Sequence, residues 1–269
     1  KLPLVNVYEI GSLAEKLSTN TYPGRGIVLG VTPDGTHSVA AYFIMGRSVN
    51  SRNRIFAFEP DGIRTEAHDP SLMKDPHLII YHPVREAGCG LIVTNGDQTD
   101  TIWEYLARGE SWEAALRTRM FEDDGPNWTP RISGLLAGDG SYKMSILKAA
   151  DAEGSACARF FYEYPGIPAL GHFIHTYKCD GNPLPSFEGE PKTLELPDVE
   201  IDELTDILWK EYEKIDDYTL ESYKCNAWDN CIPWAMYVAF GETKKILRLN
   251  LGEIIVGEIE EQFRRNFGP

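Results

Sequence analysis

The sequence lacks the signatures of most metal and nucleotide sites. It has five cysteines among 269 residues, no CxxC pair, and six histidines that do not fall at zinc-finger spacings. No HExxH or EF-hand pattern is present, and neither is a GxxxxGK[ST] or GxGxxG loop. These absences exclude the common motif-defined metal and nucleotide-loop sites, so we expect no metal ion and no cofactor.

Signatures of covalent catalysis and of membrane insertion are missing as well. There is no GxSxG elbow, and no nucleophile signature surrounds Cys89, Cys157, Cys179, Cys225 or Cys231. We expect reduced, mostly buried thiols, as is usual in a cytoplasmic protein. No run of about 18 apolar residues occurs, and the first twenty residues lack an apolar signal core. The sequence therefore predicts neither a membrane span nor a secretion signal.

Basic residues are scarce. Lysine and arginine total 26 against 41 acidic residues, which gives a net charge of −15. Such a chain is poorly suited to nucleic acid or to an anionic membrane surface. An apolar content of 42% is ordinary for a globular protein. We expect residues 1–269 to form one domain, because the chain after the proline-rich loop near 183–191 is too short for a second core.

Short apolar runs bounded by Gly, Pro, Asp or Asn predict many β-strands. Residues 25–46 predict two strands joined by a turn at Pro33-Asp34-Gly35. Further strand-like runs cover residues 54–60, 77–84, 90–96, 131–138, 141–149, 156–164, 171–178, 231–240 and 245–251. Strand pairs with tight turns favour an α+β fold with mainly antiparallel sheets.

Three segments have helical patterns. Residues 9–18 repeat apolar side chains at spacings of three and four, and 200–212 place Ile201, Leu204, Leu208 and Tyr212 on one stripe. Residues 99–121 are interrupted at Gly109. We expect Thr99 or Asp100 to cap the first piece of this segment and Ser111 to cap the second.

Arginine is concentrated in one region. Between Tyr22 and Arg54 stand Arg25, Arg47, Arg52 and Arg54, and Asp34 is the one acidic residue there. Guanidinium groups suit planar recognition of phosphate or carboxylate. The alternative is that these arginines are solvated and pair with the acidic surface.

Other polar clusters follow the strands. "NGDQTDTI" (95–102) leads from a strand into a helix N-terminus, where backbone N–H groups favour an anion, and "FEDDGPNWTPR" (121–131) surrounds a Gly-Pro turn. Tyr81 with His82, and His175 with Tyr177, stand at strand ends. Each of these groups could instead be an ordinary turn, cap or structural residue. Arg, Tyr, Glu and Asn together suit proton transfer and electrostatic stabilisation on an anionic small molecule.

Six segments in one order carry a family resemblance. "YPGRGIVLG", "YFIMGRSVNSRNR", "DPHLIIYHPVR", "VTNGDQTDTI", "NWTPRISG" and "GNPLPSF" resemble the archaeal-type IMP cyclohydrolase family, in a form with a longer N-terminus and tail. The match runs from about 22 to 190, with 1–21 an N-terminal extension and 195–269 less diagnostic. The resemblance implies the fold of N-terminal-nucleophile hydrolases, a four-layer αββα sandwich of two stacked, mainly antiparallel sheets.

The implied reaction is dehydrative ring closure of 5-formamidoimidazole-4-carboxamide ribonucleotide to IMP, the last step of de novo inosinate synthesis. The resemblance implies no cofactor and no metal, a purine ribonucleotide as substrate, a cytoplasmic location and a homo-oligomer. It assigns catalysis to Arg54, Tyr81 and Glu122. It assigns substrate binding or site architecture to Arg25, Arg47, Ser48, Asn53, Asn95, Gly96, Asp100, Asn127, Thr129 and Arg131.

Two other functions stay open from the sequence. An amide hydrolase of the same fold would need cleavage that exposes a nucleophile such as Ser18 or Thr19, because the matching strand begins near Arg25, behind about twenty extra residues. A non-catalytic protein could instead have kept the arginine site and bind purine nucleotides without turnover.

Overall fold

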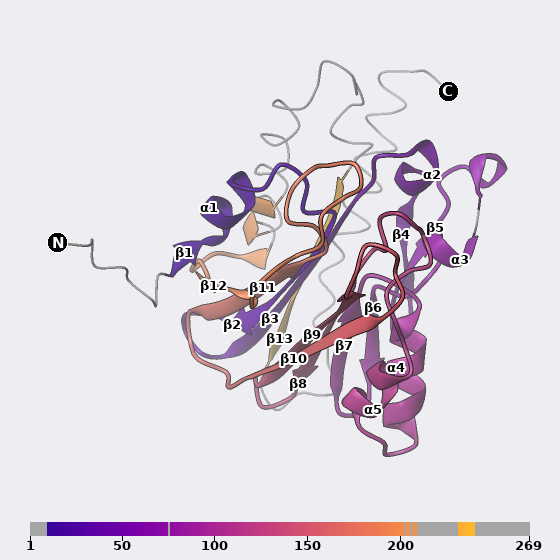
Figure 1. The fold of residues 1–269 in the computed structure, drawn as a ribbon. Coiled ribbons are helices and arrows are strands. Elements are labelled where there is room, and N and C mark those ends of the chain that lie inside the picture. Colours follow the sequence, from indigo (N-terminus) through magenta and orange to yellow (C-terminus); the bar gives the residue numbers. More distant parts are fainter. Residues whose placement is uncertain (1–9, 75, 202, 205–206, 209–230, 240–269) are drawn as a thin grey trace, which may run out of the picture.

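The structure, a computed structural model, describes residues 10–74, 76–201, 203–204, 207–208 and 231–239. Its strands form two sheets that lie face to face with an apolar core between them (Figure 1). The predicted α+β class with mainly antiparallel sheets is confirmed. The strand expected at 245–251, Tyr212 and Cys225 lie outside the described residues.

One sheet has six strands in the order β1-β12-β11-β2-β3-β13. They are β1 (Gly11–Ser12), β2 (Arg25–Val31), β3 (His37–Met45), β11 (Leu170–His175), β12 (Lys192–Glu195) and β13 (Cys231–Ala239). Neighbours are antiparallel except β1 and β12, which are parallel. The predicted hairpin turn is present: the Asp34 carboxylate accepts hydrogen bonds from the Thr32 hydroxyl (2.6 Å) and the Thr36 N–H (3.0 Å), and Gly35 has a φ of 70°.

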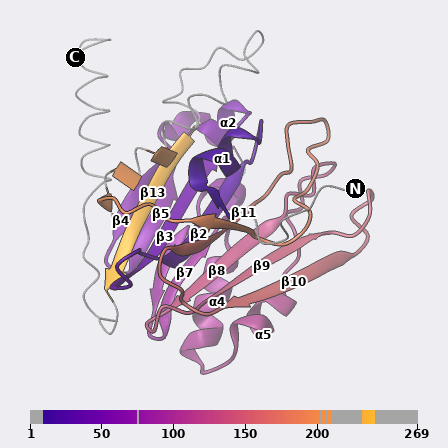
Figure 2. The same cartoon turned by 90° about the vertical axis from the view of Figure 1, so that its left-hand side faces the viewer.

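The other sheet has seven strands that follow one another along the chain, in the order β10-β9-β8-β7-β6-β5-β4 (Figure 2). They are β4 (Ile55–Glu59), β5 (Gly62–Glu66), β6 (Val84–Ala87), β7 (Gly90–Thr94), β8 (Arg131–Ala137), β9 (Tyr142–Ala149) and β10 (Cys157–Tyr164). Every pair is antiparallel. Short turns join β4 to β5, β6 to β7 and β8 to β9, as the Gly, Asp and Asn positions predict, whereas longer connections join β5 to β6, β7 to β8 and β9 to β10.

The core between the sheets follows from the two-residue period of a strand. Ile27 and Leu29 of β2 face the seven-stranded sheet and join a cluster with Val93 and Ile132. Val28, between them, faces the opposite side and belongs to a second cluster. Because both faces of β2 are covered, all seven of its residues are buried, which explains its unbroken apolar run.

Helices α1 (Leu13–Ser18), α4 (Gln98–Ala107) and α5 (Trp112–Arg117) cover outer faces of the sheets. The short helices α2 (Val49–Arg52) and α3 (Pro76–Ile79), and a 3₁₀ turn at Pro70–Leu72, lie in the connections before β4 and β6. Ile102 of α4 and Trp112 of α5 pack on the outer face of the seven-stranded sheet. The outer face of the six-stranded sheet is covered by Leu17 of α1 and by Leu204 and Leu208 of the predicted 200–212 stripe.

Residues 11–20, which precede the region that resembles the family, pack onto the core. The side chain of Ser12 accepts the N–H of Glu15 at 3.2 Å, and the Glu15 carboxylate accepts the N–H of Ser12 at 2.8 Å, which caps α1. Asn20 then donates to the carbonyl of Tyr177 at 3.0 Å. Residues 11–20 therefore extend the six-stranded sheet and its helical cover.

Several local predictions were wrong. Residues 77–79, at the start of the strand expected over 77–84, belong to helix α3 (Pro76–Ile79), because Pro76 has its φ fixed near the helical value at the first position. Neither Thr99 nor Asp100 caps α4: the helix begins at Gln98, and the Thr99 hydroxyl donates instead to the carbonyl of His82 at 2.5 Å. Strands β5 and β12 are not predicted by the sequence; residues 11–12, expected in a helix, form β1, and β6 shares only Val84 with the strand expected over 77–84.

The cysteines also differ from expectation. Cys89 is exposed in the turn between β6 and β7, and Cys157 and Cys179 are half-buried. These three thiols are free, but none of them is buried, because turn, edge-strand and loop positions leave them at the surface. Among the described helices, none is both long and apolar enough to cross a membrane.

Candidate active site

Five chain segments converge at one end of the stacked sheets. Arg25 opens β2 of the six-stranded sheet, opposite the end of β3. In the seven-stranded sheet, Arg54 immediately precedes β4, β7 ends at Thr94, and Arg131 opens β8 beside it. Side chains at strand ends project past the core, and here they bring arginines, tyrosines and Glu122 close enough to interact electrostatically.

Two buried guanidinium groups dominate this cluster. Arg54 is 4% exposed; its Nε donates to the carbonyl of Ser51 at 2.7 Å, but its Nη1 and Nη2 have no partner among the described residues. Arg25 is 8% exposed, and its Nε likewise has no partner there. Buried donors without partners are costly. Their presence fits a site that receives an anion or an oxygen with developing negative charge.

The two arginines differ in their electrostatic surroundings. Burial lowers the pKa of Arg54, and the charge of Arg25 acts in the same direction. Burial also opposes the charge of Arg25, but the carboxylate of Glu122 together with the neighbouring tyrosines Tyr177, Tyr81 and Tyr22 outweighs it, so the pKa of Arg25 is raised. Arg25 thus has a compensating charge nearby, whereas the charge of Arg54 is largely uncompensated.

Four tyrosines surround the arginines. The hydroxyls of Tyr42 and Tyr81 lie 2.8 Å apart, and burial raises the pKa of Tyr42. Tyr22 stacks with Tyr177 at a centroid distance of 5.8 Å, and burial raises the pKa of both phenols, so Tyr22, Tyr42 and Tyr177 act as neutral hydrogen-bonding groups near pH 7.

Glu122 is the buried acid of the cluster. It is 5% exposed, and burial raises the pKa of its carboxyl group even though Arg25 opposes the shift. The loop around it is closed by its N–H, which donates to the carbonyl of Thr129 at 2.9 Å. The Thr129 hydroxyl donates to Asp124 at 2.5 Å and lies 2.5 Å from the hydroxyl of Tyr177. Glu122 is therefore held in a fixed loop that packs against the tyrosines.

Gly96 allows a close approach of two charged groups. A Cβ atom there would lie 2.5 Å from Nη1 of Arg131 and 3.5 Å from Oε1 of Glu122. Arg131 is also held by Asp97 (2.6 Å) and by Gln98 (2.7 Å) at the start of α4. Three of the predicted site residues, Gly96, Glu122 and Arg131, are therefore neighbours.

The three predicted asparagines hold loops. The side chain of Asn95 donates to the carbonyl of Pro130 and accepts the N–H of Ile132, both at 2.8 Å. Asn53 makes the same kind of double contact with the backbone of Asp69, and Asn127 accepts the N–H of Leu184 at 3.0 Å. Their amides are engaged within the chain, and they shape the walls around the arginines.

Arg47 and Ser48 lie at the rim. Arg47 forms an ion pair with Asp180 at 2.8 Å, donates to the carbonyl of Gly181 at 2.9 Å, and lies over the ring of Tyr22. Ser48 is exposed and hydrogen-bonded to Ser51. The alternative reading of the arginine segment, surface pairing with acids, therefore describes Arg47 but not Arg25 or Arg54. The side chain of Arg52 lies outside the described part of the structure.

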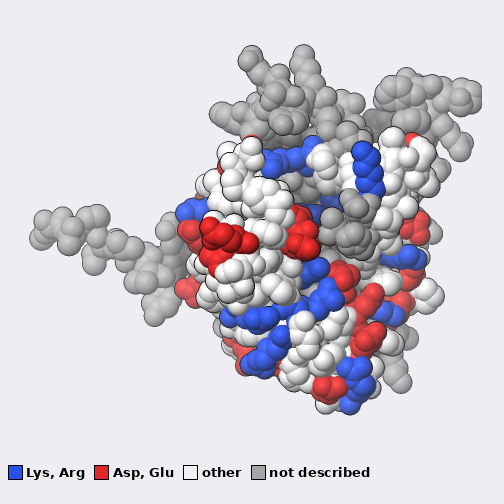
Figure 3. All heavy atoms as spheres, turned by 45° about the vertical axis from the view of Figure 1, so that its right-hand side comes forward, with Lys and Arg blue, Asp and Glu red and all other residues white. Residues whose placement is uncertain are grey.

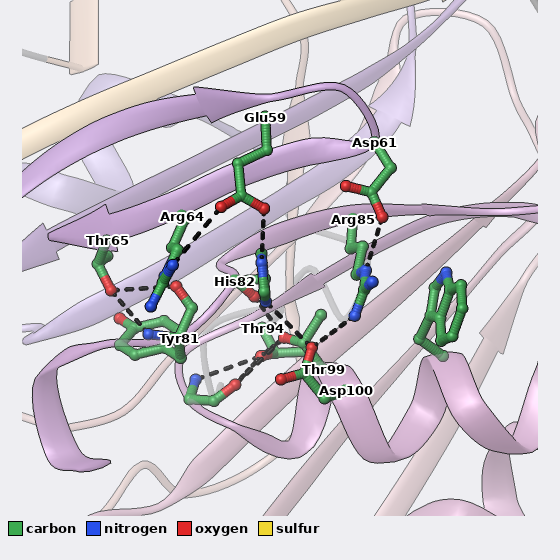
Figure 4. A network of polar contacts seen from close by, with 12 residues as sticks. Glu59, Asp61, Arg64, Thr65, Tyr81, His82, Arg85, Thr94, Thr99 and Asp100 are labelled. Atoms are coloured by element: carbon green, nitrogen blue, oxygen red, sulfur yellow. Dashed lines mark hydrogen bonds and ion pairs between the residues drawn. The ribbon is translucent and has the colours of Figure 1, made fainter. Parts of the chain in front are cut away.

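Asp100 belongs to a separate polar network (Figure 4). One of its oxygens lies 3.0 Å from Nδ1 of His82 and 2.8 Å from Nη1 of Arg85. His82 contacts Glu59 through its other ring nitrogen at 3.0 Å. This network joins β4, the segment after α3, and α4. Asp100 therefore contacts His82, the residue next to Tyr81, and does not belong to the cluster of Arg25 and Arg54.

Some members of the cluster were not predicted from the sequence. Tyr42 was not singled out, although its place between Ala40 and Ile44 on an alternating strand puts it on the inner face. The sequence offers Tyr177 only as a strand-end residue with a structural alternative, and it does not distinguish Asp97 or Gln98 within the 95–102 segment. Their contacts depend on pairings between distant segments, for which the sequence gives no local signal.

The described residues contain no group of three or more His, Cys, Asp or Glu side chains that could hold a metal ion. Acidic and basic side chains lie next to one another on the face in Figure 3. Many of these charges form ion pairs at the surface, such as Arg108 with Glu110 (2.8 Å) and Lys178 with Glu188 (2.7 Å). The buried Arg25 and Arg54 differ from these because their free donors contact no carboxylate of the described residues.

The protein is therefore of the α+β class: two sheets are stacked, and a buried cluster of arginine, tyrosine and glutamate side chains lies at one end of them. Residues 22–222 match the model of the IMP cyclohydrolase-like protein family, and the chain belongs to that family. The matched region begins at Tyr22, where the sequence resemblance begins, and extends beyond its predicted end at 190.

Curated relatives are archaeal proteins named IMP cyclohydrolase. The chain is 35% identical to that of Halobacterium salinarum over 133 residues, which are 48% of this chain and 63% of the relative. It is 31% identical to that of Methanopyrus kandleri over 185 residues, or 62% and 89% of the two chains. For Methanococcus aeolicus the identity is 27% over 162 residues, or 59% and 75%. The matched region thus spans less than two thirds of the Halobacterium relative.

Proposed function

We propose that this protein is an IMP cyclohydrolase that closes the purine ring of 5-formamidoimidazole-4-carboxamide ribonucleotide. The observation that carries the proposal is the pair Arg25 and Arg54, buried with free donors beside Glu122 and Tyr81. Membership of the family and the names of the relatives agree with it. In the proposal, residues 1–269 act as one cytoplasmic domain.

The reaction needs positioning, charge stabilisation and proton movement. The carboxamide nitrogen attacks the formyl carbon, so a C–N bond forms, that nitrogen loses a proton and the formyl oxygen gains one. The resulting carbinolamine then loses its hydroxyl group and the proton of the former formamido nitrogen as water. The two side arms belong to one molecule, so the attack is already intramolecular; holding them in the reactive conformation supplies much of the rate.

In this scheme Arg54 donates from its free Nη atoms to the formyl or carboxamide oxygen. A buried, largely uncompensated guanidinium stabilises a developing oxyanion more than one that already faces a carboxylate. Tyr81 relays a proton, with Tyr42 in hydrogen-bond contact. Glu122 orients the attacking amide or accepts its proton, and its raised pKa makes it a stronger base than an exposed glutamate.

Substrate binding is assigned around this centre. Arg25 and Arg131 both supply positive charge that acts on Glu122, and Arg47 and Ser48 stand at the rim. Gly96 gives the space that Arg131 and Glu122 need, and Asn53, Asn95, Asn127 and Thr129 support the walls. Asp100 acts through the His82 and Arg85 network in this proposal.

We further infer the four-layer αββα arrangement of the N-terminal-nucleophile hydrolases. α4 with α5 on one outer face, and α1 with Leu204 and Leu208 on the other, support it. The strand that carries the nucleophile in such hydrolases corresponds to β2, which begins with Arg25 behind α1. The chemistry is therefore assigned to side chains of the cluster rather than to a free amino terminus.

The processed amide hydrolase finds little support. Ser18 and Thr19, the residues that cleavage would have to expose, donate to the carbonyls of Glu15 and Lys16 at 3.1 and 3.2 Å. Leu17 beside them is buried in the core. Cleavage there would disrupt α1, so intact mass of the active protein should equal that of the uncleaved chain.

The test is an absorbance assay of IMP formation from the formamido ribonucleotide, without added metal and with EDTA present. Turnover that survives EDTA and is lost in Arg54→Ala supports the proposal. Tight IMP binding without turnover would assign the protein to the non-catalytic class. Turnover that EDTA abolishes would contradict a mechanism based on arginine, tyrosine and glutamate alone.

A further inference from the structure

Strand β10 forms one edge of the seven-stranded sheet (Figure 2). It pairs with β9 along all eight of its residues without a bulge, and no described strand pairs with its other side. It contains neither proline nor glycine. A long, regular edge strand exposes unpaired N–H and C=O groups and can pair with another chain.

The two faces of β10 carry different side chains. Cys157 and Phe161 pack toward α4 and α5, so Arg159 and Glu163 lie on that same side. Tyr162 and Tyr164 pack against the core between the sheets, and Phe160, on their side, is 42% exposed. The edge therefore presents two opposite charges on one face and aromatic rings on the other.

We infer that β10 pairs antiparallel with β10 of a second copy of this chain, across a two-fold axis at Phe161. The sequence "ARFFYE" (158–163) is complementary to itself in this register: Arg159 lies opposite the partner's Glu163, and Phe160 lies opposite the partner's Tyr162. Cross-strand pairs of opposite charge and of aromatic rings both stabilise antiparallel strands. The two seven-stranded sheets become one continuous sheet.

The register follows from strand geometry. Residues opposite each other in an antiparallel pair point to the same face, so the pairing can shift only in steps of two residues. A shift of the axis to Phe160 or Tyr162 places a charged residue opposite Cys157 or Phe161 and separates Arg159 from Glu163. The axis at Phe161 keeps both ion pairs and both aromatic pairs.

The charged side chains already occupy suitable positions. Arg159 donates to the carbonyl of Arg119 at 2.8 Å, and Glu163 contacts Lys143 at 2.9 Å while its side chain stays 68% exposed. Exposed ion pairs add little energy. The stability of the pair therefore comes from backbone hydrogen bonds and aromatic burial, and the charges select the register.

Sedimentation equilibrium of the full chain from about 1 to about 100 µM, the range in which small interfaces associate, tests this inference. We expect concentration-dependent association. R159E and E163R should each raise the dissociation constant at least roughly tenfold, since two attractive pairs become two repulsive pairs. The double variant R159E/E163R should restore it to within about threefold, because the pairs reform with reversed polarity.

Two surface variants are matched controls: R108E breaks an exposed pair with Glu110, and E188R breaks one with Lys178. Both should associate like the parent. Hydrogen exchange of residues 157–164, slower in the associated state, provides a second readout that needs no variant. A monomeric parent at the highest concentration, single variants that match the controls, or exchange in β10 independent of concentration would each overturn the inference.

Discussion

The hydroxyl oxygens of Tyr42 and Tyr81 lie 2.8 Å apart, although Tyr42 belongs to β3 and Tyr81 follows α3 on the way to the other sheet. The backbone of Tyr81 is fixed by Thr65, whose hydroxyl accepts its N–H at 3.0 Å. One hydroxyl must donate and the other accept, so one of the two phenol protons stays free for another acceptor. This arrangement gives the proposed proton relay a defined geometry.

Tyr81→Phe should lower kcat about a hundredfold and change nucleotide affinity less than about threefold, because proton transfer is lost while the ring still fills its place. Steady-state kinetics and calorimetric titration with IMP measure the two effects. Tyr42→Phe, which keeps the Tyr81 hydroxyl, should cost about tenfold or less. Equal losses of turnover and affinity in Tyr81→Phe would remove its relay role.

Arg54→Met should stabilise the unliganded protein by about 1 to 3 kcal/mol. It removes a buried positive charge that the charge of Arg25 repels, and two donor atoms, Nη1 and Nη2, that have no partner among the described residues. The same change should lower turnover at least about a thousandfold. Urea unfolding without ligand measures the first effect. A destabilised variant would show that Arg54 has a compensating partner in the free protein.

Glu122 should make both activity and stability depend on pH. Its raised pKa means that the folded protein binds this proton more tightly than the unfolded chain, whose value is near 4.5. The resulting stabilisation is present below pH 4.5 and is lost as pH rises through the folded pKa. Glu122→Gln should remove this loss. If Glu122 is the base, kcat/KM should fall at low pH with a midpoint above pH 4.5, and this fall should disappear in Glu122→Gln. A fall that persists in the variant would assign the titration to another group.

Gly96→Ala should reduce activity strongly, because the new methyl group would lie 2.5 Å from Arg131 and 2.7 Å from the side chain of Gln98. Overpacking of this kind costs about 1 to 3 kcal/mol. Gly88→Ala is the matched control, since a Cβ atom there meets nothing within 4 Å. Thermal unfolding and kinetics of both variants should separate them; similar behaviour would mean that Arg131 moves aside at little cost.

Asp100→Asn tests whether Asp100 binds substrate or supports the network in Figure 4. Loss of its charge weakens the contacts with His82 and Arg85 at 3.0 and 2.8 Å, so the free energy of unfolding should fall by about 1 kcal/mol. We expect KM to change less than about threefold. A large rise in KM with unchanged stability would return Asp100 to the substrate-binding residues.

Most strands could be predicted from local pattern. The hairpin at Pro33-Asp34-Gly35 and the turn at Asp139-Gly140 are decided by residues that stabilise tight turns within a few positions. Ser111 caps α5 as predicted, because a cap needs only its own first turn. Prediction failed at α3, where Pro76 favours the first position of a helix, and at the start of α4, where the contact of Thr99 with His82 decides the structure.

The sequence by itself determined the alternating strands, the acidic surface and the excess of arginine between Tyr22 and Arg54. Only the tertiary structure decided which arginines are buried: Arg25 and Arg54 stand at strand ends between the sheets, whereas Arg47 pairs with Asp180 at the surface. Side chains of the same type, close in sequence, thus have different roles. Their roles depend on distant partners and on burial, because the free energy of a charge is set by the groups and the solvent around it.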